Sequence, residues 1–331
     1  MHALFRIRHA ILLALVALAM PALAWEPTRP VEIIVPAGAG GATDQMARVI
    51  QSIITKYKLM KQSVIIQLKG GASGAEGIMD LKAGAGEPHK FLIASSAIYT
   101  IPLATDLPFN WRDLTPVALI AMDEFILWVN AESPYKTPKE YLAVVKASPE
   151  KFKMGGTGSK REDHIITAAV EKAQGVKFTY IPYKSGGEIS TQLVGNHIDS
   201  DVNNPSESVA QWRAGQVRTL CVFDNQRLPF KAKVTKDQSW GDIPTCKESG
   251  VDVEYLMLRG IFMPGGVSAD QTAFYVDLFK KILATAEWRE YVETNALKDT
   301  FLTGNDFKKF LDDDEKRHRE LMTAAGFMAT K

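Results

Sequence analysis

The sequence predicts an α/β protein built from two doubly wound parallel-sheet domains that are joined by two crossing strands. Three observations lead to this prediction. Short apolar runs alternate with helical repeats up to residue 96 and again between residues 152 and 223. Two longer apolar stretches, residues 114–129 and 255–263, lie on either side of the second alternating unit. The 331 residues also exceed the size of one typical domain.

The first alternating unit begins with the apolar run 31–35, which is typical of a buried parallel strand. A helix is expected next, because five apolar residues recur at helical spacing and mark one face. These residues are Met46, Ile50, Ile53, Ile54 and Tyr57. Residues 64–66 and 91–94 are the next two strands, with a short helix at 78–83 between them. This alternation places the strands parallel to one another in a single sheet.

The second unit repeats the alternation after a helix that starts at Pro138, where Thr137 and Glu140 form a capping box. Its strands are expected at 152–155, 178–181, 198–202 and 217–223, and its helices at 162–173, 189–194 and 206–212. Helices from Ser268 and from about Asp306 complete the chain. The crossing strands divide it into domain 1, residues 25–124 and 257–331, and domain 2, residues 125–256. Two such domains close around a ligand in the cleft between them.

Residues 1–24 are expected to be a secretory signal peptide that is cleaved and lies outside the fold. A basic start with Arg6 and Arg8 precedes the apolar residues 10–20 and a small-residue cleavage site, Ala22-Leu23-Ala24. The apolar stretch is shorter than the ~20 residues of a membrane-spanning helix. Cleavage removes two of 39 basic and none of 38 acidic residues, so the mature exported protein is expected to have a net charge of −1. This charge excludes bulk attraction for nucleic acid or an anionic membrane.

The chain has two cysteines, Cys221 and Cys246, which lack the spacing of metal ligands. In an oxidising compartment the two thiols can pair, and we expect this disulfide. The alternative is two separate buried thiols. The composition is otherwise that of an ordinary globular protein, with 46% hydrophobic and 23% charged residues, which excludes a disordered or collagen-like chain.

Two glycine-rich loops, residues 36–44 and 70–77, each follow a predicted strand and precede a predicted helix. Glycine lets the backbone turn sharply and approach a ligand. Exposed amides at a helix N-terminus favour an anion, because the helix dipole is positive there. Thr43 or Asp44 is expected to cap the first helix. Because the loops follow neighbouring parallel strands, both point at one crevice, and a carboxylate suits their amides.

The second domain adds polar loops that can bind the far end of a ligand. Arg161 can grip a carboxylate with two hydrogen bonds, while Lys160 can act as a point charge. Arg259, in the second crossing stretch, can reach the cleft or pair with an acid at the hinge. The candidate ligand-binding side chains outside the glycine loops are Ser95, Thr157, Ser159, Lys160, Arg161, Tyr183 and Asn204.

Other site chemistries fit the sequence less well. Neither glycine loop contains the lysine of a nucleotide-binding P-loop, and residues 38–43 lack the third glycine of a dinucleotide fingerprint. Residues 199–203 start like a calcium loop, but Asn204 replaces its glycine. We therefore expect no metal and no cofactor. The alternative function is a secreted serine hydrolase of unknown specificity, because Ser73 lies in a segment that resembles a nucleophile elbow, although Ala75 replaces the last glycine.

These motifs, in this order, resemble those of the Bug family, the extracytoplasmic solute-binding receptors of tripartite tricarboxylate transporters. The resemblance covers residues 30–326, and its most specific segments are residues 30–44, 69–74, 182–187 and 264–268. Ala37 and Ala39 depart from the pattern, where the family often has an aromatic residue and a proline. Residues 158–163 and 301–304 look closest to the tricarboxylate-receptor branch.

The resemblance implies a two-lobed type II periplasmic binding protein that captures a small di- or tricarboxylate, aliphatic or aromatic. It also implies delivery of this ligand to one small and one large membrane subunit of a transporter. We expect a monomer without enzymatic activity. In such receptors, backbone amides of the two domain-1 loops hold a carboxylate. The corresponding residues are Gly38, Ala39, Gly40, Gly41, Ala42, Thr43, Gly71, Ala72, Ser73 and Gly74.

Overall fold

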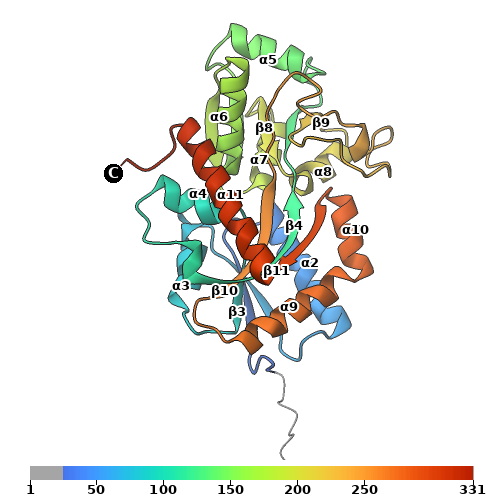
Figure 1. Ribbon diagram of the computed structural model, residues 1–331. Helices are drawn as coiled ribbons and strands as arrows, with labels where there is room; N and C mark the ends of the chain where they lie inside the picture. Colours follow the sequence, from blue (N-terminus) through green and yellow to red (C-terminus); the bar gives the residue numbers. More distant parts are fainter. Residues whose placement is uncertain (1–24, 331) are drawn as a thin grey trace, which may run out of the picture.

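The computed structural model describes residues 25–330, so the predicted signal peptide lies outside the described residues. The chain forms two lobes, each built on its own β-sheet with helices packed around it (Figure 1). Lobe 1 contains a six-stranded sheet and lobe 2 a five-stranded sheet. The two-lobed α/β architecture predicted from the sequence is confirmed. Within residues 25–330, no helix combines the length and the apolar character needed to cross a bilayer.

The sheet of lobe 1 has the strand order β11-β4-β10-β3-β1-β2. Strands β1, β2 and β3 are parallel, as the alternating pattern predicts. Strand β10 is antiparallel to β3 and to β4, and β11 is antiparallel to β4, so this sheet is mixed. The strands are β1 (Val31–Val35), β2 (Val64–Leu68), β3 (Lys90–Ala94), β4 (Leu114–Asp123), β10 (Met257–Pro264) and β11 (Lys298–Thr303).

The sheet of lobe 2 has the order β7-β6-β8-β5-β9. Strand β6 is parallel to both β7 and β8, whereas β5 is antiparallel to β8 and β9. The loops that follow the parallel strands β6 and β7 contact lobe 1, through Arg161 and Lys184. The strands are β5 (Ile126–Asn130), β6 (Lys153–Thr157), β7 (Thr179–Tyr183), β8 (Ser200–Asn203) and β9 (Val217–Val222).

Helices cover both sheets. They are α2 (Ala42–Tyr57), α3 (Ala75–Ala83), α4 (Ala97–Ala104), α5 (Pro138–Ala147), α6 (Glu162–Gln174), α7 (Gly186–Val194), α8 (Pro205–Arg213), α9 (Ala269–Leu283), α10 (Ala286–Thr294) and α11 (Gly304–Ala324). The capping box of α5 forms as predicted. In α2 the predicted face is buried, except that Tyr57 is 45% exposed at the helix end. Helices α4 and α10 and strand β11 were not predicted from the sequence.

Two segments cross between the lobes. Strand β4 ends at Asp123 and β5 begins at Ile126, so Glu124 and Phe125 form the first crossing. The return crossing leads into β10, which pairs with β4 along its length. Helix α11 packs on α4 and β4 of lobe 1 and reaches α6 of lobe 2 (Figure 1). The lobes are therefore connected by paired strands, beside which a long helix runs.

Cys221 and Cys246 form the expected disulfide, and both are fully buried. The bond joins the end of β9 to the segment that leads back toward lobe 1, across a sequence separation of 25 residues. It therefore closes a loop that includes the exposed residues 225–227.

Replacing both cysteines with alanine is expected to lower the free energy of unfolding by about 3 kcal/mol, because the unfolded chain regains the entropy of an open loop. Urea unfolding of the wild type and of the Cys221→Ala, Cys246→Ala variant measures the difference. Alkylation of both thiols in the unreduced protein, detected by mass spectrometry, would contradict the disulfide itself.

Candidate functional site

Both lobes contribute residues to a small cavity beside the crossing strands. Its volume is about 30 Å³, room for one or two water molecules, so the lobes are in contact across the cleft. The lining comes from the ends of β1, β3, β6 and β7, from the first turns of four helices and from the crossings. The residues are Ala37, Gly41, Ala42, Thr43, Ser95, Phe125, Thr157, Arg161, Glu162, Asp163, Ser185, Gly186, Asn204, Glu207, Met257 and Arg259.

Part of the predicted binding set lines this cavity, and the rest lies on the same loops around it. The lining members are Gly41, Ala42, Thr43, Ser95, Thr157, Arg161 and Asn204. Gly38 and Ala39 instead hold the lobes together: the Gly38 amide donates to Lys184 O at 3.3 Å, and Ala39 O accepts from Ser185 Oγ at 3.0 Å. Ser159 is exposed.

The first glycine loop leads into α2, whose N-cap is Gly41. The predicted cap by Thr43 or Asp44 is wrong. Asp44 lies inside the first turn, and its Oδ2 accepts the Gly40 amide at 2.9 Å. The Thr43 hydroxyl accepts a hydrogen bond from Arg259 Nη1 at 2.7 Å. No side chain of the N-cap residue therefore competes for the free amides of α2.

Two helix N-termini of lobe 1 each receive a carboxylate from lobe 2. The Ala42 amide, first in α2, donates to Glu207 Oε1 at 2.9 Å. The Ala97 amide, first in α4, donates to Glu162 Oε1 at 2.7 Å. Neither glutamate was predicted as a site residue, because an acid in the first turn of a helix is usually a local capping residue. These contacts show that the amides facing the cleft can bind a carboxylate.

The second glycine loop, after β2, places its backbone against lobe 2. Gly74 has φ 100°, and a Cβ there would lie 2.6 Å from Pro36 O, so only glycine fits. Ser73 has φ 59°, and its carbonyl accepts a hydrogen bond from Arg161 Nη1 at 2.9 Å. Gly71 and Ala72 are exposed. Among residues 25–330, the Ser73 hydroxyl forms no hydrogen bond with a histidine.

Arg161 is buried at the start of α6 and ties the two lobes together. Its Nε binds Glu162 Oε2 at 3.1 Å, and its Nη2 donates to Ser95 Oγ at 3.2 Å, in addition to the Ser73 contact. Burial alone would raise the pKa of Glu162, but the Arg161 guanidinium and local hydrogen bonds hold it below its usual value. The predicted anion-gripping side chain is therefore already paired with an internal carboxylate.

Lys160 and Tyr183, two further members of the predicted set, are half-buried beside the cleft. Lys160 has φ 57°, and its amide donates to Nδ1 of His164 at 3.1 Å. The His164 ring stacks on Tyr180 with a centroid distance of 3.9 Å. Burial and the nearby lysines lower the pKa of His164 to about 4, so its unprotonated Nδ1 accepts this bond at neutral pH. The contact fixes the loop before α6.

Arg259, in β10, forms both of the contacts that the sequence left open. It pairs with Asp123 at the end of β4, through Nε at 2.9 Å and through Nη2 at 2.5 Å. It also binds Thr43 in α2, as described above, and its Nη2 donates to Asn204 Oδ1 in lobe 2 at 3.3 Å. Both members of the ion pair are 1% exposed. Arg259 therefore joins the crossing strands, the first glycine loop and lobe 2.

Carboxyl groups outnumber guanidinium groups around the cavity. The charged lining residues are Glu162, Asp163, Glu207, Arg161 and Arg259. Asp201 lies beneath them in β8, is fully buried, and has no hydrogen-bond partner for either oxygen among residues 25–330. Burial raises the pKa of Asp163 and of Asp201 well above the usual range, and raises that of Glu207 to about 6.

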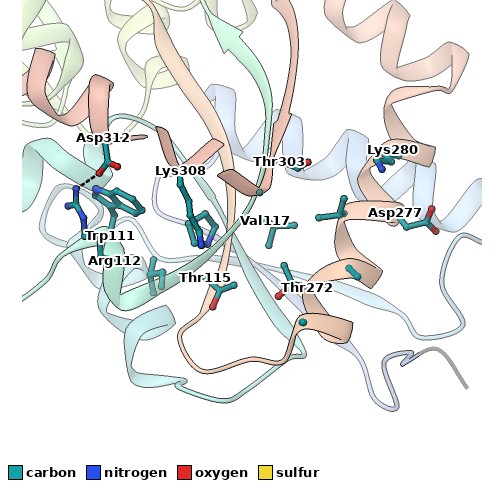
Figure 2. Close-up of a pocket in the computed structure, with 16 residues that line it drawn as sticks. Trp111, Arg112, Thr115, Val117, Thr272, Asp277, Lys280, Thr303, Lys308 and Asp312 are labelled. Atoms are coloured by element: carbon teal, nitrogen blue, oxygen red, sulfur yellow. Dashed lines mark hydrogen bonds and ion pairs between the residues drawn. The ribbon is translucent and has the colours of Figure 1, made fainter. Parts of the chain in front are cut away.

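A much larger hollow lies away from the cleft, on lobe 1 between β4, α9 and α11 (Figure 2). It is an open groove of about 910 Å³, and Arg112 at its rim is paired with Asp312. Lys280 and Lys308 also line it. No residue of the two glycine loops contributes to this groove. We therefore place the candidate site in the interlobe cleft, where backbone amides already bind carboxylates.

Comparison with known proteins gives one consistent family. Residues 46–327 match the family described as tripartite tricarboxylate transporter family receptor. A curated relative, the "UPF0065 protein in gbd 5'region" of Cupriavidus necator, is 28% identical over 314 residues. This alignment covers 93% of the chain and 92% of the relative.

Solved structures share the fold. The periplasmic binding protein BugD has a TM-score of 0.83 and 22% identity, covering 92% of this chain and 100% of that one. Rpa4515 of R. palustris with adipate has a TM-score of 0.81 and 22% identity, covering 91% and 98%. MatC of Rhodopseudomonas palustris with bound malate has a TM-score of 0.76 and 19% identity, covering 89% of this chain and 99% of that one. The family match over most of its length shows that this chain belongs to the tripartite tricarboxylate transporter receptor family.

Proposed function

We propose that this protein is a periplasmic receptor that captures a small di- or tricarboxylate, aliphatic or aromatic, in its interlobe cleft. The observation that carries the proposal is the Ala42 amide, which binds a carboxylate at the N-terminus of α2. The helix dipole and the free amides of the first turn favour an anion at this point. When the lobes separate, the same amides become available to a carboxylate of the ligand.

Separation of the lobes is required, because a cavity of about 30 Å³ cannot hold a dicarboxylate. We assign residues 25–124 and 257–331 to domain 1, which contains the sheet of lobe 1, and residues 125–256 to domain 2, which contains the sheet of lobe 2. This division places the hinge at Glu124–Phe125 and before β10. In this arrangement the backbone of the two domain-1 loops holds one carboxylate. Side chains of domain 2, including Thr157 and Asn204 in the cavity wall, select the rest of the ligand.

The family also supports a place for the receptor in transport. Residues 1–24 would direct export, and the monomeric receptor would deliver its ligand to one small and one large membrane subunit of a tripartite tricarboxylate transporter. Two proteins of the same fold are named with adipate and with malate, which supports a dicarboxylate as the ligand of this chain. We also propose that the protein has no enzymatic activity and uses no metal or cofactor.

A thermal-shift screen of residues 25–331 against di- and tricarboxylates tests this function. Because a ligand that binds only the native state stabilises it by RT ln(1 + [L]/Kd), a ligand at one hundred times its Kd contributes about 2.7 kcal/mol. We expect a rise in Tm of about 5 °C for at least one carboxylate. The uncharged diamides of the same carbon skeletons are the matched control. Equal shifts for acid and diamide, or none in the whole series, would contradict the proposal.

A further inference from the structure

Glu207 places a carboxylate of lobe 2 on the anion site of lobe 1. It is the third residue of α8, and its Oε2 accepts the Asn204 amide at 3.2 Å in a capping box. Its other oxygen extends across the cleft and accepts the Ala42 amide at 2.9 Å. A purely local capping residue would not make this second contact.

The surrounding backbone leaves space for this carboxylate. A Cβ on Gly186, the first residue of α7, would lie 2.0–2.4 Å from the Glu207 carboxyl atoms, so only glycine permits its position. On the opposite side, Gly41 is the N-cap of α2 and offers no side chain to the helix amides. Glycines of both lobes thus allow the Glu207 carboxylate to reach α2.

We propose that Glu207 is an intramolecular competitor that occupies the site of the ligand carboxylate when the lobes are in contact and thereby limits the affinity of the receptor for its ligand. This inference rests on the proposed function, because it assumes that a ligand carboxylate binds the first amides of α2. The ligand must then displace Glu207 from Ala42 as the cleft closes around it. The affinity for the ligand then depends on the difference in binding free energy between the ligand carboxylate and the Glu207 carboxylate at the same amides.

The charges that face Glu207 determine its ionisation. They come from Arg259 of β10, Asp123 of β4, Asp163 of α6, Asp201 of β8 and the Tyr291 hydroxyl of α10. Arg259 is the one cation among them, and it is already paired with Asp123. Burial therefore prevails over Arg259 and over the Ala42 hydrogen bond, and raises the pKa of Glu207 to about 6.

This ionisation gives the competition a definite pH dependence. At pH 7.5 Glu207 is ionised and binds the α2 amides with a charge-assisted hydrogen bond. At pH 5.5 it is mostly protonated and is a weaker acceptor. An ionised ligand carboxylate should therefore bind more tightly as the pH falls from 7.5 to 5.5.

Calorimetric titration with malate and with adipate at both pH values tests the inference in two variants and a control. Glu207→Gln keeps the size of the side chain and removes its charge. Glu207→Asp keeps the charge but withdraws it from Ala42 by one methylene. Glu188→Gln is the matched control, because Glu188 is also the third residue of a lobe 2 helix but is exposed.

We expect both Glu207 variants to bind about tenfold more tightly than the wild type at pH 7.5. Glu188→Gln should bind as the wild type does. Wild-type affinity should rise between pH 7.5 and 5.5 by more than that of Glu207→Gln, whose own change reports protonation of the malate or adipate.

Unchanged or weaker binding by both Glu207 variants would overturn the inference and leave the proposed function intact, since it would show that Glu207 does not compete. Tighter binding by Glu207→Gln alone would also overturn it, because a general charge effect would then explain the gain. Absence of carboxylate binding in the wild type and in all variants would instead overturn the proposed function, and the competition with it.

Discussion

Replacing Arg259 with methionine is expected to lower the free energy of unfolding by about 3–5 kcal/mol. Methionine keeps most of the length of the arginine stem, so the loss comes mainly from the charge. Asp123 would remain 1% exposed with no cation, and the Thr43 hydroxyl and Asn204 Oδ1 would each lose a donor. A buried carboxylate without a cation destabilises the folded protein by much more than the intact ion pair stabilised it.

Two further variants separate the charge from the packing. The double variant Arg259→Met, Asp123→Leu should recover most of the lost stability, because an apolar pair can replace a buried ion pair with little cost. Lys281→Met is the matched control: it breaks an exposed ion pair with Asp277, and should change the free energy of unfolding by less than about 1 kcal/mol. Unfolding in guanidinium chloride measures the free energy of unfolding of all three variants and of the wild type. A loss below 1 kcal/mol in the single variant would show that Asp123 becomes protonated or hydrated without penalty.

The fold could be predicted because its elements have distinct sequence periods. Strands β1 and β2 are short runs rich in β-branched residues, and α2 has a clear apolar face. Helix α4 and strand β11 lack such a period. Helix α4 is apolar on nearly all sides and contains Pro102, so no face stands out. Strand β11 is polar and only partly buried, and its position depends on pairing with β4, which is distant in the chain.

The candidate site could be predicted most directly where the backbone conformation requires a particular residue. Gly74 is required by its positive φ and by its contact with Pro36, and such glycines are visible in the sequence. Glu162 and Glu207 were missed for the opposite reason. Each has the sequence pattern of an ordinary acid in the first turn of a helix, and its partner lies in the other lobe. Only the closed arrangement of the lobes shows these contacts.

Arg161→Ala is expected to weaken the binding of every carboxylate by about 2–5 kcal/mol, which is at least about 30-fold in Kd. The sequence predicts instead that Arg161 grips a distal carboxylate, so that monocarboxylates would be affected little. In the structure its guanidinium binds Glu162 within lobe 2, and Ser73 and Ser95 in lobe 1. Its removal breaks two contacts between the lobes and leaves the buried Glu162 carboxylate without a cation, which disfavours the closed form whatever the ligand.

Calorimetric titration with malate and with its monocarboxylate analogue lactate distinguishes the two roles. Equal losses of affinity for both ligands support the interlobe role. A loss of affinity for malate alone would instead indicate that Arg161 binds the distal carboxylate directly. Arg218→Ala is the matched control, because Arg218 binds three backbone carbonyls entirely within lobe 2 and should affect stability more than affinity. Adding Glu162→Gln to Arg161→Ala should recover part of the affinity, since the unpaired charge is removed. If the double variant binds no better than Arg161→Ala alone, the penalty does not come from Glu162, and the two lost contacts to Ser73 and Ser95 account for it.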